Sequence, residues 1–275
     1  MSDRAPNRSE DLALLRDAAL AAGPIMRDGF HADYEIWSKG AAGPVTAIDL
    51  AVDAMLKERL RTARPDFAWL SEETADNADR LSKRRVFVVD PIDGTRAFIK
   101  KKPDFVTAIA IVEDGKPVAG VIYNPITEEL YEAVDGHGAT LNGAAITVST
   151  ASEVEGSRMI GPEDVFRNPR WPTPWPPMEI IHKNAVAYRL ALVASGAHDA
   201  TVALGWKSEW DIAAATVIVR EAGGRVSDPW DGEITFNNPD PRAPGVIASG
   251  PRLHPSLIER VKIAPHPSRF SERPA

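Results

Sequence analysis

The first part of the chain carries two stretches of apolar residues at helical spacing. Steps of three and four residues predict a helix over residues 11–29, and a second helix follows over residues 48–60. Thr46 and Asp49 at the start of the second stretch form a T-x-x-D capping pattern. The apolar positions of the first helix are Leu12, Leu15, Ala19, Ala22 and Met26.

Shorter apolar runs, typical of strands, follow. Residues 86–89 predict a buried strand that ends at Asp90-Pro91. Residues 106–112 and 117–123 flank Asp114-Gly115 and predict a hairpin, with a further strand over 130–133 and a turn-rich segment over 135–143. This meander predicts helices packed on an antiparallel sheet in the first half.

Strands and helices alternate in the second half. The pattern predicts helices over 185–195, 210–222 and 257–261, and strands over 201–204, 225–227 and 246–249, which is typical of α/β organisation. Residues 162–177 hold six of the 23 prolines, with Trp171 and Trp175 between them, and we expect a surface loop. The tail from Ala264 is expected to be frayed.

The length of 275 residues allows two domains at roughly 150 residues each. We expect an N-terminal α+β lobe over 1–150 and a C-terminal α/β lobe over 151–275. The fold class is therefore α/β (α+β).

Composition excludes several kinds of function. With 32 basic and 39 acidic side chains the net charge is −7, which argues against binding of a nucleic-acid polymer. The absence of cysteine excludes disulfides, thiolate metal sites and cysteine nucleophiles, and fits a reducing compartment. The N-terminus is polar and no run of ~18 apolar residues occurs, so we expect a cytoplasmic protein without a membrane span.

Acidic residues at the ends of predicted elements are the candidate chemistry. Each has an ordinary explanation: helix capping for Asp49 and Asp211, a turn for Asp93-Gly94, and a solvated pair for Glu72-Glu73. Asp90 and Asp93, however, leave a buried strand within four residues, and two carboxylates held so close repel unless a cation relieves them. Oxygen ligands without His or Cys suit Mg²⁺ rather than zinc.

Other common catalytic motifs are absent from the sequence. The six histidines show no H-x-H or H-E-x-x-H spacing. The phosphate-binding loop of ATPases, the dinucleotide fingerprint G-x-G-x-x-G and the nucleophile elbow G-x-S-x-G do not occur.

The acidic segments together resemble the inositol monophosphatase superfamily of Mg²⁺-dependent, lithium-sensitive phosphatases. Four blocks occur in that family's order: Val45-Thr46-Ala47-Ile48-Asp49, Ser71-Glu72-Glu73, Asp90-Pro91-Ile92-Asp93-Gly94-Thr95, and Trp210-Asp211 through Glu221-Ala222-Gly223-Gly224. The resemblance implies a layered αβαβα sandwich of the inositol monophosphatase and fructose bisphosphatase type. Dimers are common in the superfamily, so a homodimer is expected.

The resemblance also implies roles for individual residues. Glu72, Asp90 and the carbonyl of Ile92 would hold a first Mg²⁺, and Asp90, Asp93 and Asp211 a second, with a third ion on Glu72. Thr95 and Glu72 would orient and deprotonate the attacking water, with Asp49 holding the Thr95 hydroxyl. The substrate would be bound by Asp93, Gly94, Thr95, Arg189 and Asp211.

The substrate is less defined than the reaction. Inositol monophosphatases carry a Glu seven residues before the helix-opening Asp, and this chain has Leu204 there; their glycine-small-alanine loop corresponds to residues 184–186. Arg189 matches a basic residue that faces the second phosphate in the bisphosphate nucleotidase branch. The residues within the motif blocks most resemble those of bacterial 3′(2′),5′-bisphosphate nucleotidases, which convert 3′-phosphoadenosine 5′-phosphate to AMP. An inositol or other sugar-phosphate phosphatase and a catalytically inactive metal-binding relative are the alternatives.

A basic run, Lys100-Lys101-Lys102, follows the phosphate loop. It is either a solvated face or a collar that attracts a polyanionic substrate.

Overall fold

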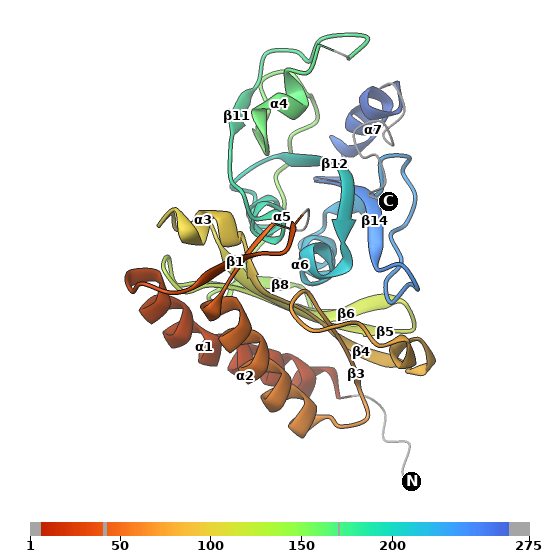
Figure 1. Cartoon of the computed structure of the whole chain (residues 1–275). Coiled ribbons are helices and arrows are strands. Elements are labelled where there is room, and N and C mark those ends of the chain that lie inside the picture. The colour runs from red at the N-terminus through yellow and green to blue at the C-terminus, as the bar shows by residue number, and fades with distance from the viewer. Residues whose placement is uncertain (1–6, 41–42, 170, 264–275) are drawn as a thin grey trace.

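The protein is a stack of five layers, in which helices and sheets alternate (Figure 1). The computed structural model describes residues 7–40, 43–169 and 171–263. Helices α1 and α2 form the outer layer on one side, and a seven-stranded sheet lies above them. Helices α5 and α6 form the middle layer, followed by a five-stranded sheet and then by α4 and α7. The αβαβα sandwich is confirmed.

The described residues form the following elements. The helices are α1 Arg8–His31, α2 Ala47–Ala63, the 3₁₀ helix η2 Ala78–Ser82, α3 Thr95–Ile99, α4 Glu163–Phe166, α5 Val186–Ala194, α6 Glu209–Glu221 and α7 His254–Lys262. The strands are β1 Ile36–Ser38, β2 Pro44–Thr46, β3 Ala68–Ser71, β4 Arg85–Asp93, β5 Val106–Glu113, β6 Lys116–Asn124, β7 Glu129–Val134, β8 Ala139–Leu141, β9 Ala144–Ala145, β10 Arg158–Ile160, β11 Glu179–Ile181, β12 Ala200–Ser208, β13 Arg225–Ser227 and β14 Arg242–Ser249.

The larger sheet has the strand order β3-β4-β5-β6-β7-β8-β9. The antiparallel prediction is confirmed from β4 to β9, but it is wrong for β3, which pairs parallel to β4. The turn-rich segment 135–143 contains the short strand β8. The parallel pair has a consequence for chemistry, since the carboxyl ends of β3 and β4 reach the same edge of the sheet.

The outer helices are held by the residues that the apolar spacing identified. Leu15, Ala19, Ala22 and Met26 of α1 are fully buried under the larger sheet. Helix α2 begins with a capping box, in which the Thr46 hydroxyl accepts from the Asp49 amide and the Asp49 carboxylate accepts from the Thr46 amide. The cap fixes Asp49 at the start of a helix that faces the sheet.

The middle layer joins the two halves of the chain. Helix α6 packs on β5 and β6 on one side and contacts β12, β13 and β14 on the other, so nearly all of its middle residues are buried. Gly120 of β6 permits this contact, because a Cβ there would lie 2.6 Å from the carbonyl oxygen of Ala214. One hydrophobic core therefore contains residues from both the N-terminal and the C-terminal parts.

The smaller sheet has the order β11-β10-β12-β14-β13, with β10, β11 and β12 parallel and β14 antiparallel to both of its neighbours. The α/β organisation expected for this half thus holds with a mixed sheet. The proline-rich segment 162–177 is largely irregular, but it contains the one-turn helix α4 and buries Trp171 against Trp175. The tail from Ala264 lies outside the described residues.

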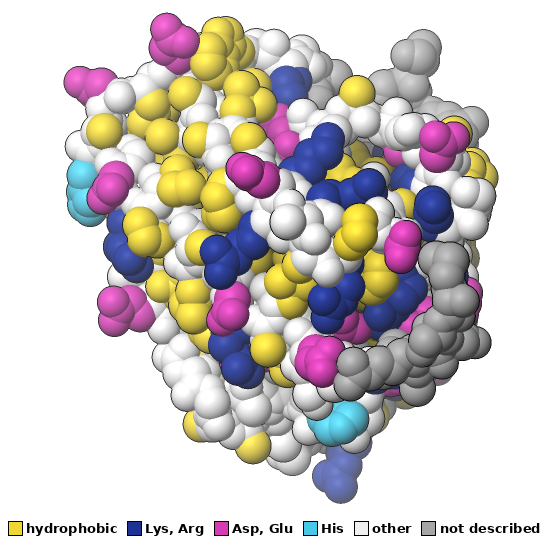
Figure 2. All heavy atoms as spheres, turned by 90° about the horizontal axis from the view of Figure 1, so that it is seen from below, with side chains coloured by type: hydrophobic (Ala, Val, Ile, Leu, Met, Phe, Trp, Pro, Cys, Tyr) yellow, Lys and Arg dark blue, Asp and Glu magenta, His cyan; other side chains and the backbone are white. Residues whose placement is uncertain are grey.

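Within the part of the chain that the structure describes, no helix is long and apolar enough to cross a membrane. The face seen from below, over α1 and α2, intersperses hydrophobic, basic and acidic side chains (Figure 2). This face therefore presents no field of a single sign.

Candidate active site

Four of the acidic residues singled out in the sequence line one cavity of about 260 Å³. The cavity lies where the edge of the larger sheet meets the N-termini of α5 and α6. Its lining holds the predicted residues Glu72, Asp90, Ile92, Asp93, Gly94, Thr95 and Asp211, together with Pro44, Arg96 and Asn184. Asp49 and Arg189 are not among the lining residues.

The parallel pair β3–β4 brings the first two acids together. Glu72 directly follows β3, and its amide donates to the carbonyl of Val89 in β4, at 3.3 Å. Asp90 lies next along β4, so the two carboxylates project at the same edge. The prediction that this strand ends at Asp90 is wrong: β4 continues to Asp93, with a break in its pairing to β5 between Asp90 and Asp93. The break lets both acids reach the cavity from one strand.

Two helices of the second half fix the other carboxylates. The amide of Ala187, in the first turn of α5, donates to Asp93 Oδ2 at 2.5 Å. The amide of Ser208 donates to Asp211 Oδ2 at 3.0 Å at the start of α6. Helix N-termini favour negative charge, so these contacts orient the two carboxylates at the cavity.

Thr95 occupies the position next to these acids and is held by two acceptors. Its hydroxyl lies 3.0 Å from Asp49 Oδ1 and 3.1 Å from the carbonyl oxygen of Ile92. A hydroxyl has one hydrogen and two lone pairs, so donation to either acceptor leaves a lone pair for a third group. The sequence expectation that Asp49 holds the Thr95 hydroxyl agrees with this contact.

Gly94 makes the sharp turn between β4 and α3. Its φ is +100°, in the left-handed region, and a Cβ there would lie 2.7 Å from the carbonyl oxygen of Asp104. Only glycine fits this close approach, which sets Thr95 at the first residue of α3 and facing the cavity.

Burial and mutual repulsion perturb the cavity acids. Burial raises the pKa of Asp211 to about 8, and the charges of Asp93 and Glu72 add to the effect. Burial likewise raises the pKa of Asp93 to about 7, although the Ala187 amide and Arg189 oppose it. The pKa of Asp90 is raised well above its usual range by burial and by the charge of Glu72. The folded chain thus holds a set of carboxylates that a cation would stabilise.

A lysine that sequence reasoning missed supplies one such charge. Lys39 Nζ lies 2.7 Å from Glu72 Oε1 and 2.8 Å from Glu73 Oε1. Burial opposes the charge of Lys39, but its two carboxylate partners outweigh this and its pKa is raised. Glu73, whose pKa burial raises to about 7, is bound here and does not line the cavity. A lone lysine in a glycine-containing loop has no motif that could have revealed it.

The donor set fits a hard divalent cation. Asp90 Oδ1 is buried and has no hydrogen-bond partner among the described residues. The carboxylates that line the cavity supply oxygen ligands, which such a cation prefers. No three described His, Cys, Asp or Glu side chains converge into one tight metal-binding group. Backbone amides and Lys39 instead hold the carboxylates apart, around the wall of the cavity. The cavity volume is several times the ~30 Å³ that one water occupies in the liquid, so the cavity has room for more than one small group.

Two further cations lie behind the cavity. Arg189 of α5 is 4% exposed, and its Nε and Nη1 have no partner in the described part of the chain. Its charge acts on Asp93 and Asp211. Lys207 is half-buried near Asp211, and its Nζ lies 3.2–3.4 Å from the carbonyl oxygens of residues 204–206. Leu204, where inositol monophosphatases carry a Glu, therefore lies beside a cation.

The lysine run does not line the cavity. None of Lys100, Lys101 and Lys102 is among the lining residues. Lys101 Nζ donates to the carbonyl of Ala32 at 3.0 Å and lies 4.7 Å from the ring centroid of Tyr34. This residue thus fastens the end of α3 to the end of α1. Among the described residues, Arg96 is the cation that lines the cavity, and its position directly after the motif block was the available signal.

Comparison with known proteins agrees with the geometry. The family model described as "Inositol monophosphatase family" matches residues 7–266. The chain belongs to the inositol monophosphatase family. Family members are phosphatases that are generally metal-dependent, and the chain is a phosphoric monoester hydrolase.

Individual members of the family match over nearly the whole chain. It is 31% identical to inositol monophosphatase 1 of Solanum lycopersicum, over 94% of this chain and 97% of that protein. It is 32% identical to the Nus factor SuhB of Haemophilus influenzae, over 89% and 93%. The crystal structure of the extragenic suppressor protein SuhB from Bartonella henselae superposes with a TM-score of 0.78 at 29% identity, covering 92% of this chain and 98% of that one.

Proposed function

We propose that the chain is a Mg²⁺-dependent phosphomonoesterase that acts by in-line attack of water. The observation that carries the proposal is the Asp49–Thr95 hydrogen bond at the wall of a cavity that Glu72, Asp90, Asp93 and Asp211 surround. A binding protein needs the carboxylates alone, whereas the pair of Thr95 and Asp49 serves a nucleophile.

The residues would divide the work as follows. Glu72, Asp90, Asp93, Asp211 and the Ile92 carbonyl would hold two or three Mg²⁺ ions. Bound there, Mg²⁺ supplies an acidified water and neutralises charge on the phosphate. Thr95 orients the water through the lone pair that its bond to Asp49 leaves open, and Glu72 accepts the proton. Asp93 and the amides of Gly94 and Thr95 position the phosphate, which needs charge neutralisation and alignment more than covalent chemistry.

Removing one proposed ligand tests the metal assignment. Asp93→Asn keeps the size of the side chain and an acceptor for the Ala187 amide, so the fold should survive. We expect turnover to be lost at saturating Mg²⁺ and isothermal titration to show weaker Mg²⁺ binding. Near-native activity in this variant would show that Asp93 is not a metal ligand.

For the substrate, we propose a small phosphate ester with a second anionic group, of the 3′(2′),5′-bisphosphate nucleotide class, so that 3′-phosphoadenosine 5′-phosphate would yield AMP and phosphate. The buried Arg189, with unpartnered donors in the described structure, supports this, because a buried guanidinium without a partner is costly. Leu204 supports it as well, since a carboxylate for sugar hydroxyls is missing at that position.

The nucleotide proposal is tested by comparing substrates. Wild type should favour the bisphosphate nucleotide over inositol 1-phosphate in kcat/KM. Arg189→Met should lose this preference through KM while keeping turnover of the simpler ester. A wild-type preference for inositol phosphates would favour the alternative of an inositol or sugar-phosphate phosphatase. Absence of release from every ester would favour a catalytically inactive metal-binding relative.

The proposal extends to inhibition by lithium, to assembly as a homodimer and to a cytoplasmic location. The cysteine-free composition supports a reducing compartment. Light scattering of the purified chain tests the dimer directly.

A further inference from the structure

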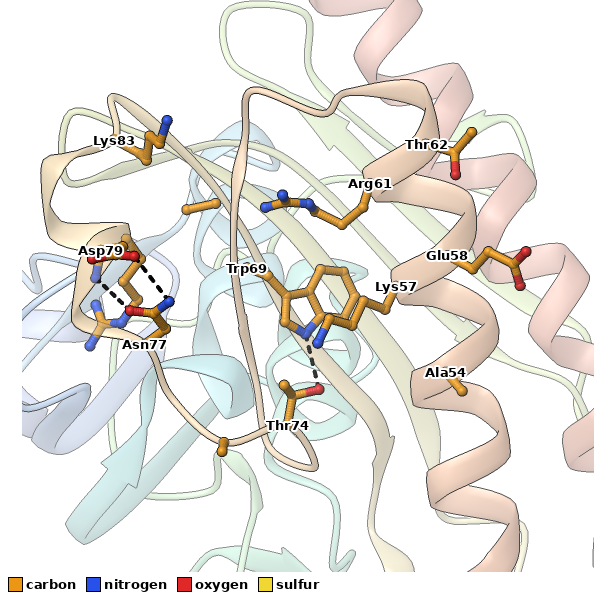
Figure 3. Close-up of a pocket in the computed structure, with 13 residues that line it drawn as sticks. Ala54, Lys57, Glu58, Arg61, Thr62, Trp69, Thr74, Asn77, Asp79 and Lys83 are labelled. Atoms are coloured by element: carbon orange, nitrogen blue, oxygen red, sulfur yellow. Dashed lines mark hydrogen bonds between the residues drawn. The ribbon is translucent and has the colours of Figure 1, made fainter.

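A larger cavity, of about 790 Å³, lies between α2 and the segment that leads through η2 (Figure 3). Its walls are formed by Lys57 and Arg61 of α2 on one side and by residues 74–83 on the other, with Trp69 of β3 between them. It shares no lining residue with the active-site cavity. Its volume is in the range of sites that bind small molecules.

The cationic side chains of this cavity outweigh its acidic ones. The side chains of Lys57 and Lys83 are exposed and make no ion pair or hydrogen bond to the rest of the described chain. Arg61 uses Nη1 for the carbonyl of Phe67, and its guanidinium extends from α2 toward the cavity (Figure 3). Glu58 extends away from Trp69 in the same view, and Asp79 is hydrogen-bonded to Asn77. In a chain of net charge −7, this is a local positive site.

Arg80 also lines the cavity, but all of its guanidinium nitrogens are hydrogen-bonded to the protein. Its guanidinium contacts both carboxylate oxygens of Asp76, at 2.7 and 3.0 Å, and also Asn237 and the carbonyl of Asn238. Arg80 is therefore committed to the fold. Lys57, Lys83 and the remaining donors of Arg61 are the groups available to an anion.

The cavity is connected to the segment that carries the proposed metal ligand Glu72. The Trp69 indole donates to Thr74 Oγ1 at 3.3 Å, and Thr74 Oγ1 donates to Asp53 Oδ2 at 2.7 Å. The other oxygen of Asp53 accepts from the Ser71 hydroxyl. Residues 71–74 are thus fastened at both ends to a network that begins at the cavity wall.

We propose that this cavity binds the phosphate or sulfate group of a small anion, and that its occupancy restrains residues 71–74. A tetrahedral oxyanion offers several acceptors to lysine ammonium groups and to the free side of a guanidinium. The ligand would reach Trp69 at the cavity wall, and a change in the indole contact would pass to Thr74 and Asp53. This inference stands independently of the reaction in the other cavity.

The test is a titration of the full chain, saturated with Mg²⁺, with sulfate. Binding is followed by the NMR signal of the Trp69 indole N–H, identified with the Trp69→Phe variant, at constant ionic strength kept with chloride. Phenyl sulfate forms a second arm. If phenyl sulfate binds more tightly than sulfate, the ligand of the site is an organic phosphate or sulfate ester. If the two bind equally, the ligand is the free inorganic anion.

Matched variants make the test specific. Lys57→Gln/Lys83→Gln removes two cavity charges, and Arg59→Gln/Lys262→Gln removes two exposed charges outside the lining. We expect the first to weaken sulfate binding about tenfold and the second to change it by less than about twofold. No saturable shift, or equal weakening in both variants, would overturn the site.

Hydrogen exchange tests the connection to the active site. Sulfate should slow amide exchange in residues 71–74 of the wild type and leave it unchanged in Lys57→Gln/Lys83→Gln. Saturable binding without any change of exchange in this segment would overturn the proposed restraint.

Discussion

Asp49 serves both the start of α2 and Thr95, and the two roles can be separated by substitution. Its Oδ2 accepts from the Thr46 amide at 2.9 Å, and its Oδ1 accepts from Thr95 at 3.0 Å. In Asp49→Asn the amide oxygen can keep the contact with Thr46, which places the NH₂ group toward Thr95. Thr95 must then accept a hydrogen bond where it had donated one, so its hydrogen turns to the Ile92 carbonyl. The orientation of the hydroxyl that Asp49 sets for the water is thereby changed, and the carboxylate charge beside it is lost.

The magnitudes differ for the two roles. Loss of an oriented acid–base group costs about 10²–10⁴-fold in rate. The stability of Asp49→Asn should change by less than about 1 kcal/mol, because the cap contact persists and burial already disfavours the charge, raising the pKa of Asp49. Thr46→Ala is the control, since it removes the capping hydroxyl without touching Thr95 and should cost about 1–2 kcal/mol.

The assay pairs phosphate release with urea unfolding of both variants. We expect Asp49→Asn to be stable and nearly inactive, and Thr46→Ala to be less stable with a kcat within a few-fold of wild type at a temperature where it is folded. Wild-type kcat in Asp49→Asn would refute the reasoning and leave Asp49 as a helix cap only.

Three further predictions concern other parts of the molecule. Gly94→Ala should lower stability by roughly 2 kcal/mol or more and reduce kcat, as measured by thermal unfolding and phosphate release, because a Cβ at φ +100° meets the Asp104 carbonyl. Burial lowers the pKa of His254 to about 4, so between pH about 4 and 6.5 the folded state binds fewer protons than the unfolded state. The free energy of unfolding, measured with urea, should therefore fall as the pH drops through this window. His254→Asn should flatten this dependence of stability on pH. Lys100→Gln/Lys102→Gln should leave kcat/KM and its salt dependence unchanged, since neither residue lines the cavity; a clear loss would restore the collar hypothesis.

Much of the fold followed from local pattern. The apolar spacing of α1, the capping box of α2 and the hairpin of β5 and β6 are local features, and their positions were predicted within a few residues. The direction of β3 was not, because the choice of a parallel partner depends on contacts distant in sequence. The continuation of β4 past Pro91 was missed for a related reason: the break in pairing needs β5 to be seen.

The candidate site shows the same division. The motif blocks identified the cavity acids, since those residues lie in contiguous segments. Lys39 has no such signal, because its role comes from a loop that brings it to Glu72 and Glu73. Arg189 was identified by its offset in a helix, but its burial behind Asp93 required the packing of α5 against the first sheet. The cavity of about 790 Å³ arises from α2 and η2, which no motif connects.

The most direct test of the central claim is phosphate release across inositol, sugar and nucleotide phosphates, with wild type and Asp93→Asn, with Mg²⁺, with chelator, and with Mg²⁺ and Li⁺ together. We predict release from at least one ester that requires Mg²⁺, falls with Li⁺ and is lost in the variant. Release from no ester, or release that persists without a divalent ion, would contradict the assignment of this cavity as a metal-dependent phosphatase site.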